Sequence, residues 1–250
     1  MNSPLLRLQA VSKSFGGLAA VQGVSLDLPA GSVSALIGPN GAGKTTLFAL
    51  ISGFIVPDSG RIAFDGSDIT GTPPHVMARR GMTRTFQIVQ PFAAQTVREN
   101  IAVGAHLRHA RRSDALEEAE LVAQRVGLAP QLDKPAGDLT VAGRKRLELA
   151  RALATQPRLL LLDEVLAGLN PQEVAEMLPV VRSLADGGVT VLMIEHVMQA
   201  VMHLASHVWV LAQGQLIAAG TPVEVTREPA VVEAYLGHGT AARLAAKGDA

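Results

Sequence analysis

A glycine-rich segment, Gly38–Thr46, constrains the fold of this chain more than any other part of it. Its sequence, Gly-Pro-Asn-Gly-Ala-Gly-Lys-Thr-Thr, fits the phosphate-loop pattern G-x-x-x-x-G-K-[ST]. The apolar run Ser32–Ile37 before it predicts a strand, and Leu47–Ile51 after it predicts a helix. Because this motif requires a strand, a turn and a helix in that order, a chance match is disfavoured. The sequence therefore predicts an α/β fold built on a phosphate-loop core.

The residue types in this loop suit a nucleoside triphosphate with Mg²⁺. Glycines let the backbone curl so that successive N–H groups point inward, and the positive end of the new helix lies beneath the same phosphates. Lys44 can reach the β- and γ-phosphates, and the Thr45 hydroxyl can ligate Mg²⁺. The predicted nucleotide-binding residues here are Gly38, Pro39, Asn40, Gly41, Ala42, Gly43, Lys44, Thr45 and Thr46.

Composition narrows the class of protein. The chain has 250 residues, 22 basic and 22 acidic side chains and no cysteine, so disulfides and thiolate metal sites are excluded. Balanced charge argues against a broad contact with nucleic acid. The N-terminus has no signal-peptide pattern, and no apolar run is long enough to cross a bilayer. We expect a cytoplasmic protein whose contact with a membrane needs a partner subunit.

Alternating apolar residues at Leu5–Val11 and at Val24–Leu28 predict two strands ahead of the phosphate loop. They indicate an N-terminal antiparallel β layer joined at the turn Phe15-Gly16-Gly17. Two roles remain open for Phe15, which can stack on an adenine ring or pack as an ordinary aromatic at a turn.

Helical periodicity dominates the middle of the chain and predicts a helical insert. We therefore expect one domain over 1–237, with a core at about 5–87 and 155–237, a helical subdomain at about 88–154, and a flexible tail at 238–250. The three helices predicted in and around this insert are Thr96–Leu107, Asp114–Val126 and Gly143–Leu153.

A second group of polar residues follows buried strands. The apolar run Arg158–Leu162 reaches Asp163, which is suited to hold Mg²⁺, and then Glu164, which is suited to polarise a water for attack on the γ-phosphate. His196 follows the buried strand Val189–Ile194 and is expected to contact the ligand.

Gln87 ends a predicted strand at Thr83–Phe86; it can ligate Mg²⁺, position water or simply be exposed. Ligands of doubly wound sheets bind at the carboxyl ends of strands. We therefore expect Gly38, Gln87, Asp163 and His196 to share one rim.

Together these motifs resemble those of the ABC-type ATPases, the nucleotide-binding subunits of membrane transporters. The resemblance covers Leu5 to about Gly237 and implies the ABC ATPase fold with bound ATP and Mg²⁺. It implies adenine stacking for Phe15 and catalytic roles for Glu164, Gln87 and His196. It also implies that two such domains hold ATP between one phosphate loop and the partner's signature loop.

The signature loop departs from the family's usual Leu-Ser-Gly-Gly-Gln. The aligned residues, which the resemblance implies contact nucleotide, are Leu139, Thr140, Val141, Ala142 and Gly143. Thr140 keeps a hydroxyl that can cap a helix and donate to phosphate. Asn170, where the family's D-loop usually has aspartate, is a second departure.

Three stretches are similar to the branch that serves branched-chain amino acid importers, and to its larger ATPase subunit. They are Arg84–Gln87, Leu166–Pro171 and Ile194–His196, and the ending, with Gly220–Pro222 and Ala234–Gly237, adds to the similarity. This implies a peripheral location on the cytoplasmic face of the inner or plasma membrane. The implied partners are a second, identical or different ATPase subunit, membrane permeases and, indirectly, a periplasmic solute-binding protein, but no nucleic acid.

Three alternatives remain. A lipopolysaccharide-export ATPase has a similar ending. A soluble ABC ATPase acting on nucleic acid or the ribosome usually carries a long coiled-coil insertion or two ATPase domains, and this chain has neither. A phosphate-loop kinase would need an acceptor-binding lid. No residue is expected to encode the transported solute, because ATPase subunits do not touch it.

Overall fold

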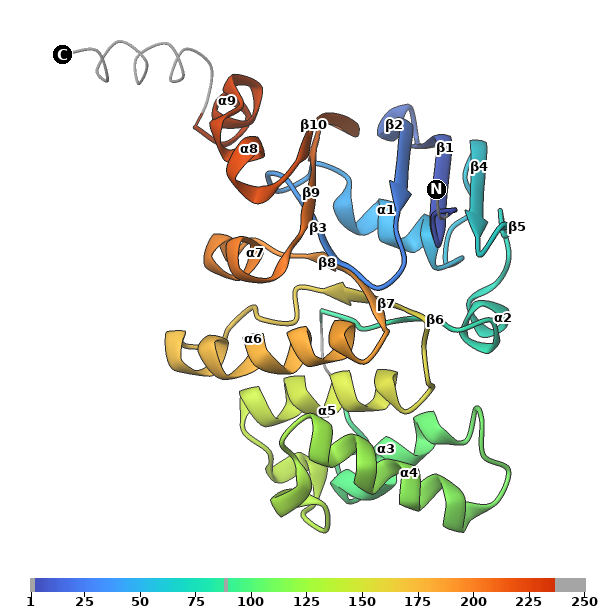
Figure 1. Ribbon diagram of the computed structural model, residues 1–250. Coiled ribbons are helices and arrows are strands. Elements are labelled where there is room, and N and C mark those ends of the chain that lie inside the picture. The colour runs from blue at the N-terminus through green and yellow to red at the C-terminus, as the bar shows by residue number, and fades with distance from the viewer. Residues whose placement is uncertain (1–2, 88–89, 237–250) are drawn as a thin grey trace, which may run out of the picture. The chain divides into compact units, whose positions relative to one another are not determined.

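The computed structural model describes residues 3–87 and 90–236, which form two compact units (Figure 1). Among these residues, unit 1 comprises 3–72 and 193–236, and unit 2 comprises 73–87 and 90–192. The predicted single domain at 1–237, with its core and helical subdomain, stays a prediction. The predicted flexible tail lies outside the described residues.

Unit 1 contains the predicted antiparallel β layer. Alternation places Leu6 and Leu8 in the core, and β1 pairs with β2 from Leu6 opposite Leu28. The sheet order is β2-β1-β4-β5 (Figure 1), so the N-terminal antiparallel layer is confirmed. Its strands are β1 (Leu6–Phe15), β2 (Leu18–Leu28), β4 (Ser59–Phe64) and β5 (Ser67–Asp68).

A second group of strands in unit 1 carries the phosphate loop. All five residues of β3 (Val33–Ile37) are buried, which fits a strand covered on both faces. It pairs in parallel with β9 (His207–Ala212), which forms the predicted hairpin with β10 (Gln215–Gly220). The helices of unit 1 are α1 (Lys44–Ile51), α7 (Met198–Leu204), α8 (Pro222–Arg227) and α9 (Pro229–Leu236).

Unit 2 contains a parallel strand pair, β6 (Met82–Arg84) and β7 (Leu159–Asp163). All five residues of β7 are buried, as its apolar run predicted. The strand β8 (Thr190–Ile194) begins in unit 2 and ends in unit 1. The flanking helices are α2 (Pro74–Arg79) and α6 (Pro171–Asp186).

Three helices of unit 2 pack together beside these strands, as the periodicity predicted (Figure 1). A capping box between Thr96 and Glu99 starts the first of them. They are α3 (Val97–Ala105), α4 (Arg112–Arg125) and α5 (Val141–Leu153), with the short 3₁₀ helices η1 (Ala129–Gln131) and η2 (Ala136–Asp138) between the last two. Among the described residues, no helix has both the length and the hydrophobicity to span a membrane.

Close packing of α3 against α5 depends on Gly104. A Cβ atom added there would lie 2.2 Å from the Arg151 carbonyl oxygen and 3.2 Å from the Ala154 Cβ. No side chain fits at the first distance without a backbone shift, so glycine sets how closely the two helices approach.

We expect Gly104→Ala to lower the free energy of unfolding by up to about 2 kcal/mol. Overpacking costs about 1–3 kcal/mol, and it outweighs the gain of about 1 kcal/mol that alanine brings in helix propensity. Urea denaturation measures the change. The control is Val103→Ala on the exposed face of the same helix, which should change stability by less than about 0.5 kcal/mol. Equal stability of both variants would contradict the packing argument.

Candidate functional site

The loop Gly38–Thr46 joins β3 to α1 within unit 1, in the predicted order of strand, turn and helix. Gly38, Gly41 and Gly43 have φ angles of 152°, 78° and 102°. A Cβ at Gly38 would lie 2.0 Å from the Leu211 carbonyl oxygen, and one at Gly43 would lie 2.2 Å from that of Ala20. Both positions therefore require glycine for conformation and for space.

Lys44 is buried beneath this loop. Its Nζ donates to the Gly38 carbonyl oxygen at 2.7 Å and to that of Pro39 at 3.0 Å. The ammonium is thus fixed at the start of α1, where the first backbone N–H groups have no partner within the helix. Thr45 and Asn40 are exposed beside it, so the loop offers donors and a hydroxyl to an anionic ligand.

Two more predicted site residues belong to unit 1. Phe15 ends β1 with 47% of its surface exposed, and the Lys13 Nζ lies 5.5 Å from the ring centroid. His196 is exposed between β8 and α7. The chain order thus places Phe15 and His196 in the unit that carries the phosphate loop.

Sequence reasoning did not single out Tyr235 on α9. Burial raises the pKa of its phenol, and a hydrogen bond from the Gly38 backbone partly offsets that rise. The C-terminal helix therefore contacts the first glycine of the phosphate loop. Only the folded chain reveals this contact, because almost two hundred residues separate the partners.

In unit 2 the loops after β6 and β7 bring two predicted catalytic residues together. The Gln87 Nε2 donates to the Glu164 Oε2 at 2.7 Å. Glu164 has a φ of 50°, in the left-handed region that few non-glycine residues adopt. Backbone strain of this kind costs about 1–3 kcal/mol and persists where surrounding contacts enforce it.

Lys145 on α5 supplies such contacts, although sequence reasoning missed it. It is only 6% exposed, and its Nζ donates to the carbonyl oxygens of Gln87 and Glu164, both at 3.2 Å. Lys145 lies four residues before buried Leu149 and therefore on the same helix face. A charged residue on a buried helix face is the sequence signal that could have identified Lys145. Lys145 thus holds the two loops at a fixed separation.

Asp163, the predicted metal ligand, forms a buried ion pair. The Arg84 Nη2 lies 2.6 Å from its Oδ2, and the two side chains are 8% and 4% exposed. The Asp163 N–H donates to the Thr85 Oγ1 at 3.1 Å. The Arg84 guanidinium carbon also lies 5.5 Å from the centroid of the Phe86 ring. The Asp163 carboxylate is therefore held by Arg84, and the Asp163 backbone is held by Thr85.

The described residues contain no group of three or more His, Asp or Glu side chains that could hold a metal by themselves. The predicted set of Thr45 hydroxyl, Gln87 amide and Asp163 carboxylate offers hard oxygen atoms. Such oxygens suit Mg²⁺, which takes few protein ligands and fills its shell with water and phosphate oxygens. The residues present therefore fit Mg²⁺ as a companion of a bound phosphate.

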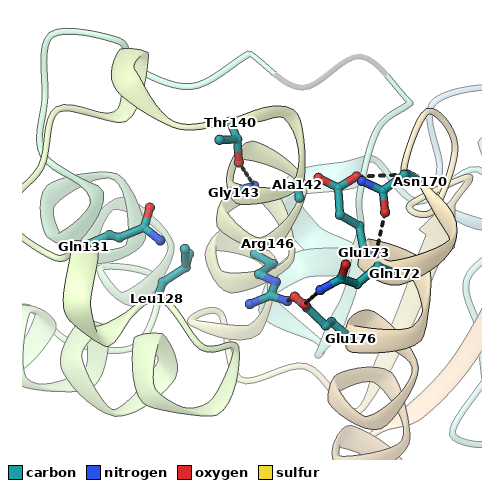
Figure 2. Close-up of a pocket in the computed structure, with 10 residues that line it drawn as sticks. All are labelled: Leu128, Gln131, Thr140, Ala142, Gly143, Arg146, Asn170, Gln172, Glu173 and Glu176. Carbon is teal, nitrogen blue, oxygen red and sulfur yellow. Dashed lines mark hydrogen bonds and ion pairs between the residues drawn. The ribbon is translucent and has the colours of Figure 1, made fainter.

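The predicted signature loop, with its unusual sequence, and Asn170 of the predicted D-loop line the same pocket of unit 2 (Figure 2). The pocket has a volume of about 370 Å³. Thr140 caps α5, as predicted, by accepting from the Gly143 N–H at 3.1 Å. Asn170 caps α6 by accepting from the Glu173 N–H at 2.9 Å. Behind the two caps, Arg146 pairs with Glu176 at 2.8 Å.

The structure thus groups the predicted site residues in two sets. Phe15, the phosphate loop and His196 belong to unit 1, and Gln87, the signature loop, Asp163 and Glu164 belong to unit 2. That Gly38, Gln87, Asp163 and His196 share one rim stays a prediction, because these residues come from different units.

Comparison with known proteins gives consistent matches. A family model described as "ABC transporter" matches residues 21–167, and one described as "Branched-chain amino acid ATP-binding cassette transporter" matches residues 215–241. The high-affinity branched-chain amino acid transport ATP-binding protein BraF of Pseudomonas aeruginosa is 41% identical, with 95% of this chain and 99% of BraF covered. LivG of Escherichia coli, which carries the same description, is 38% identical with the same coverage.

Solved structures agree with the fold. The ADP conformation of MJ1267, an ATP-binding cassette of an ABC transporter, superposes with a TM-score of 0.85 at 34% identity, covering 95% of this chain and all of MJ1267. A nucleotide-free ATP-binding cassette from an ABC transporter gives a TM-score of 0.85 at 33% identity, covering 92% and 98%.

The cap at Asn170 gives a local prediction. We expect Asn170→Ala to reduce the free energy of unfolding by about 0.5–2 kcal/mol, because the Glu173 N–H loses its side-chain acceptor. Asn170→Asp keeps an acceptor oxygen and should match the wild type within about 0.5 kcal/mol. Urea unfolding measures both, and an Asp variant as unstable as the Ala variant would show that capping is not the reason.

Proposed function

This chain belongs to the ABC transporter family of ATP-binding proteins, and on that basis we propose that it hydrolyses ATP to drive import of branched-chain or related amino acids. The observation that carries the proposal is the phosphate loop, closed by the buried Lys44 that bonds Gly38 and Pro39. The amino acid cargo rests on the printed function of BraF and LivG, each similar over 95% of this chain.

ATP binds through the backbone of Gly38–Thr46, and Lys44 turns its ammonium from carbonyl oxygens toward the phosphates. A charge-assisted bond to phosphate is about twice as strong as a neutral one. Phe15 offers an exposed ring for stacking on adenine. The signature residues Leu139–Gly143 belong to the phosphate cage of a second ATPase subunit.

Glu164 polarises the attacking water, and Gln87 and His196 orient the water and the γ-phosphate. The bond between Gln87 and Glu164 keeps the carboxylate in one direction, so the two side chains act as a unit. Thr45, Gln87 and Asp163 would hold Mg²⁺, which would supply positive charge to neutralise the charge that develops on the phosphates.

Two ATPase subunits, identical or different, enclose the nucleotides, and hydrolysis weakens their contact. In this proposal the subunits sit on the cytoplasmic face of the membrane, bound to permease subunits that receive solute from a periplasmic binding protein. Charge balance gives no basis for a nucleic-acid partner.

We expect Glu164→Gln to lower the turnover number for ATP by about a hundredfold or more, because the amide cannot accept a proton from water. ATP affinity should stay unchanged, and the variant should form an ATP-dependent dimer visible by gel filtration. Lys44→Ala is the contrasting variant, with a dissociation constant for ATP raised by about tenfold to a hundredfold. Robust hydrolysis by Glu164→Gln would remove Glu164 from its role.

The transport proposal predicts where the protein is found in cells. Expressed together with the permease subunits of such an importer, the chain should sediment with membranes and co-purify with those subunits. Expressed without those subunits, it should not sediment with membranes, because the proposal assigns the membrane contact to the permeases. A chain that stays entirely in the supernatant while its permeases are present would argue for a soluble ABC ATPase instead.

A further inference from the structure

The ion pair between Arg84 and Asp163 is nine-tenths buried on both sides. Removing one partner of such a pair leaves an uncompensated charge out of water, which is strongly destabilising. The chain thus places a fixed positive charge directly on the carboxylate that the proposed function assigns to Mg²⁺.

Local geometry keeps this pair in place. In the parallel ladder, Thr83 pairs with Leu160, and Arg84, the last residue of β6, pairs with Leu161. Leu161 lies two residues before Asp163, the last residue of β7. The Thr85 N–H donates to the Leu161 carbonyl oxygen at 2.9 Å, which extends the ladder by one bond. The guanidinium faces Phe86, and it reaches Asp163 through Oδ2.

The direction in which Arg84 changes the affinity of Asp163 for Mg²⁺ follows from its positive charge. The Arg84 guanidinium stabilises Asp163 when no metal is present, and it repels a divalent cation brought to the same carboxylate. Loss of Arg84 would also give the Asp163 side chain more rotamer freedom. Metal binding would have to restrict that freedom again, which opposes binding. That entropic term is small beside the repulsion between a divalent ion and a neighbouring buried charge.

We propose that Arg84 is the resident counter-cation of Asp163 and sets the Mg²⁺ concentration at which the nucleotide site is loaded. This inference rests on the proposed function, since it requires Asp163 to face Mg²⁺ with ATP bound. Arg84 is a positioning residue, because it acts on the metal through Asp163. It stabilises the site when no metal is bound. It also makes Mg²⁺ bind more weakly than it would bind to an unpaired Asp163 carboxylate.

The test measures binding of a fluorescent, non-hydrolysable ATP analogue, MANT-AMP-PNP, over a Mg²⁺ titration. Arg84→Met should lower the half-saturating Mg²⁺ concentration at least fivefold and leave binding in EDTA unchanged. Arg84→Lys keeps the charge and should stay within twofold of wild type. The matched control is Arg80→Met, an exposed arginine four residues earlier, which should behave as wild type.

Thermal melting supplies the second readout. Metal-free Arg84→Met should melt below wild type, and Mg²⁺ with MANT-AMP-PNP should raise its melting temperature by more than it raises that of wild type. If Arg84→Met does not fold, Arg84→Gln, which keeps a donor but no charge, must show the lowered Mg²⁺ half-point.

The outcomes separate this inference from the proposed function. An unchanged or raised Mg²⁺ half-point in the uncharged variants, with wild type binding the analogue normally, overturns the counter-cation role and leaves the function intact. A lowered melting temperature with an unchanged half-point would make Arg84 purely structural and overturns it too. Wild type that binds no analogue, or binds it without any response to Mg²⁺, overturns the proposed function itself.

Discussion

The candidate site depends on buried cations that must be paired with oxygen atoms. Lys44, Arg84 and Lys145 each have a side chain that is almost entirely out of water. A buried charge costs several kcal/mol unless polar partners replace its hydration. Lys44 bonds carbonyls of the phosphate loop, Lys145 bonds carbonyls of Gln87 and Glu164, and Arg84 bonds the Asp163 carboxylate. The loops that follow the strands are therefore shaped around these charges.

This arrangement connects helix α5 to Glu164, the proposed catalytic residue, within one unit. Thr140 caps the helix, and Lys145 lies little more than one turn later with its ammonium on the Glu164 carbonyl. The same bond helps hold Glu164 at a positive φ, a strained state that needs outside support. A displacement of the signature loop thus has a short, stiff route to the residue proposed to activate water.

The sequence predicted what depends on local pattern. The strand β7, the order of strand, turn and helix around Gly38–Thr46 and the three helices of unit 2 were confirmed, because apolar runs, glycines and helical periodicity are local signals. The family that the motifs resemble was confirmed by the relatives of this chain. The helices α7 and α8 were missed because they are too short for a periodic pattern. Arg84, Lys145 and Tyr235 were assigned no role, since their partners lie far away in the sequence. The roles assigned to the site residues stay predictions.

The unusual signature loop keeps the helix N-terminus and its cap, and it lacks the glutamine side chain that the family usually has at the position of Gly143. The Thr140 oxygen accepts from the Gly143 N–H, which leaves its own hydroxyl proton for a phosphate. A Cβ at Gly143 would lie 3.3 Å from the Cβ of buried Leu139, tighter than side chains usually pack. The family's usual glutamine would therefore require Leu139 to move. Glycine at position 143 therefore suits the place of Leu139, and the N-terminus of α5, which the resemblance implies meets an anion, remains in place.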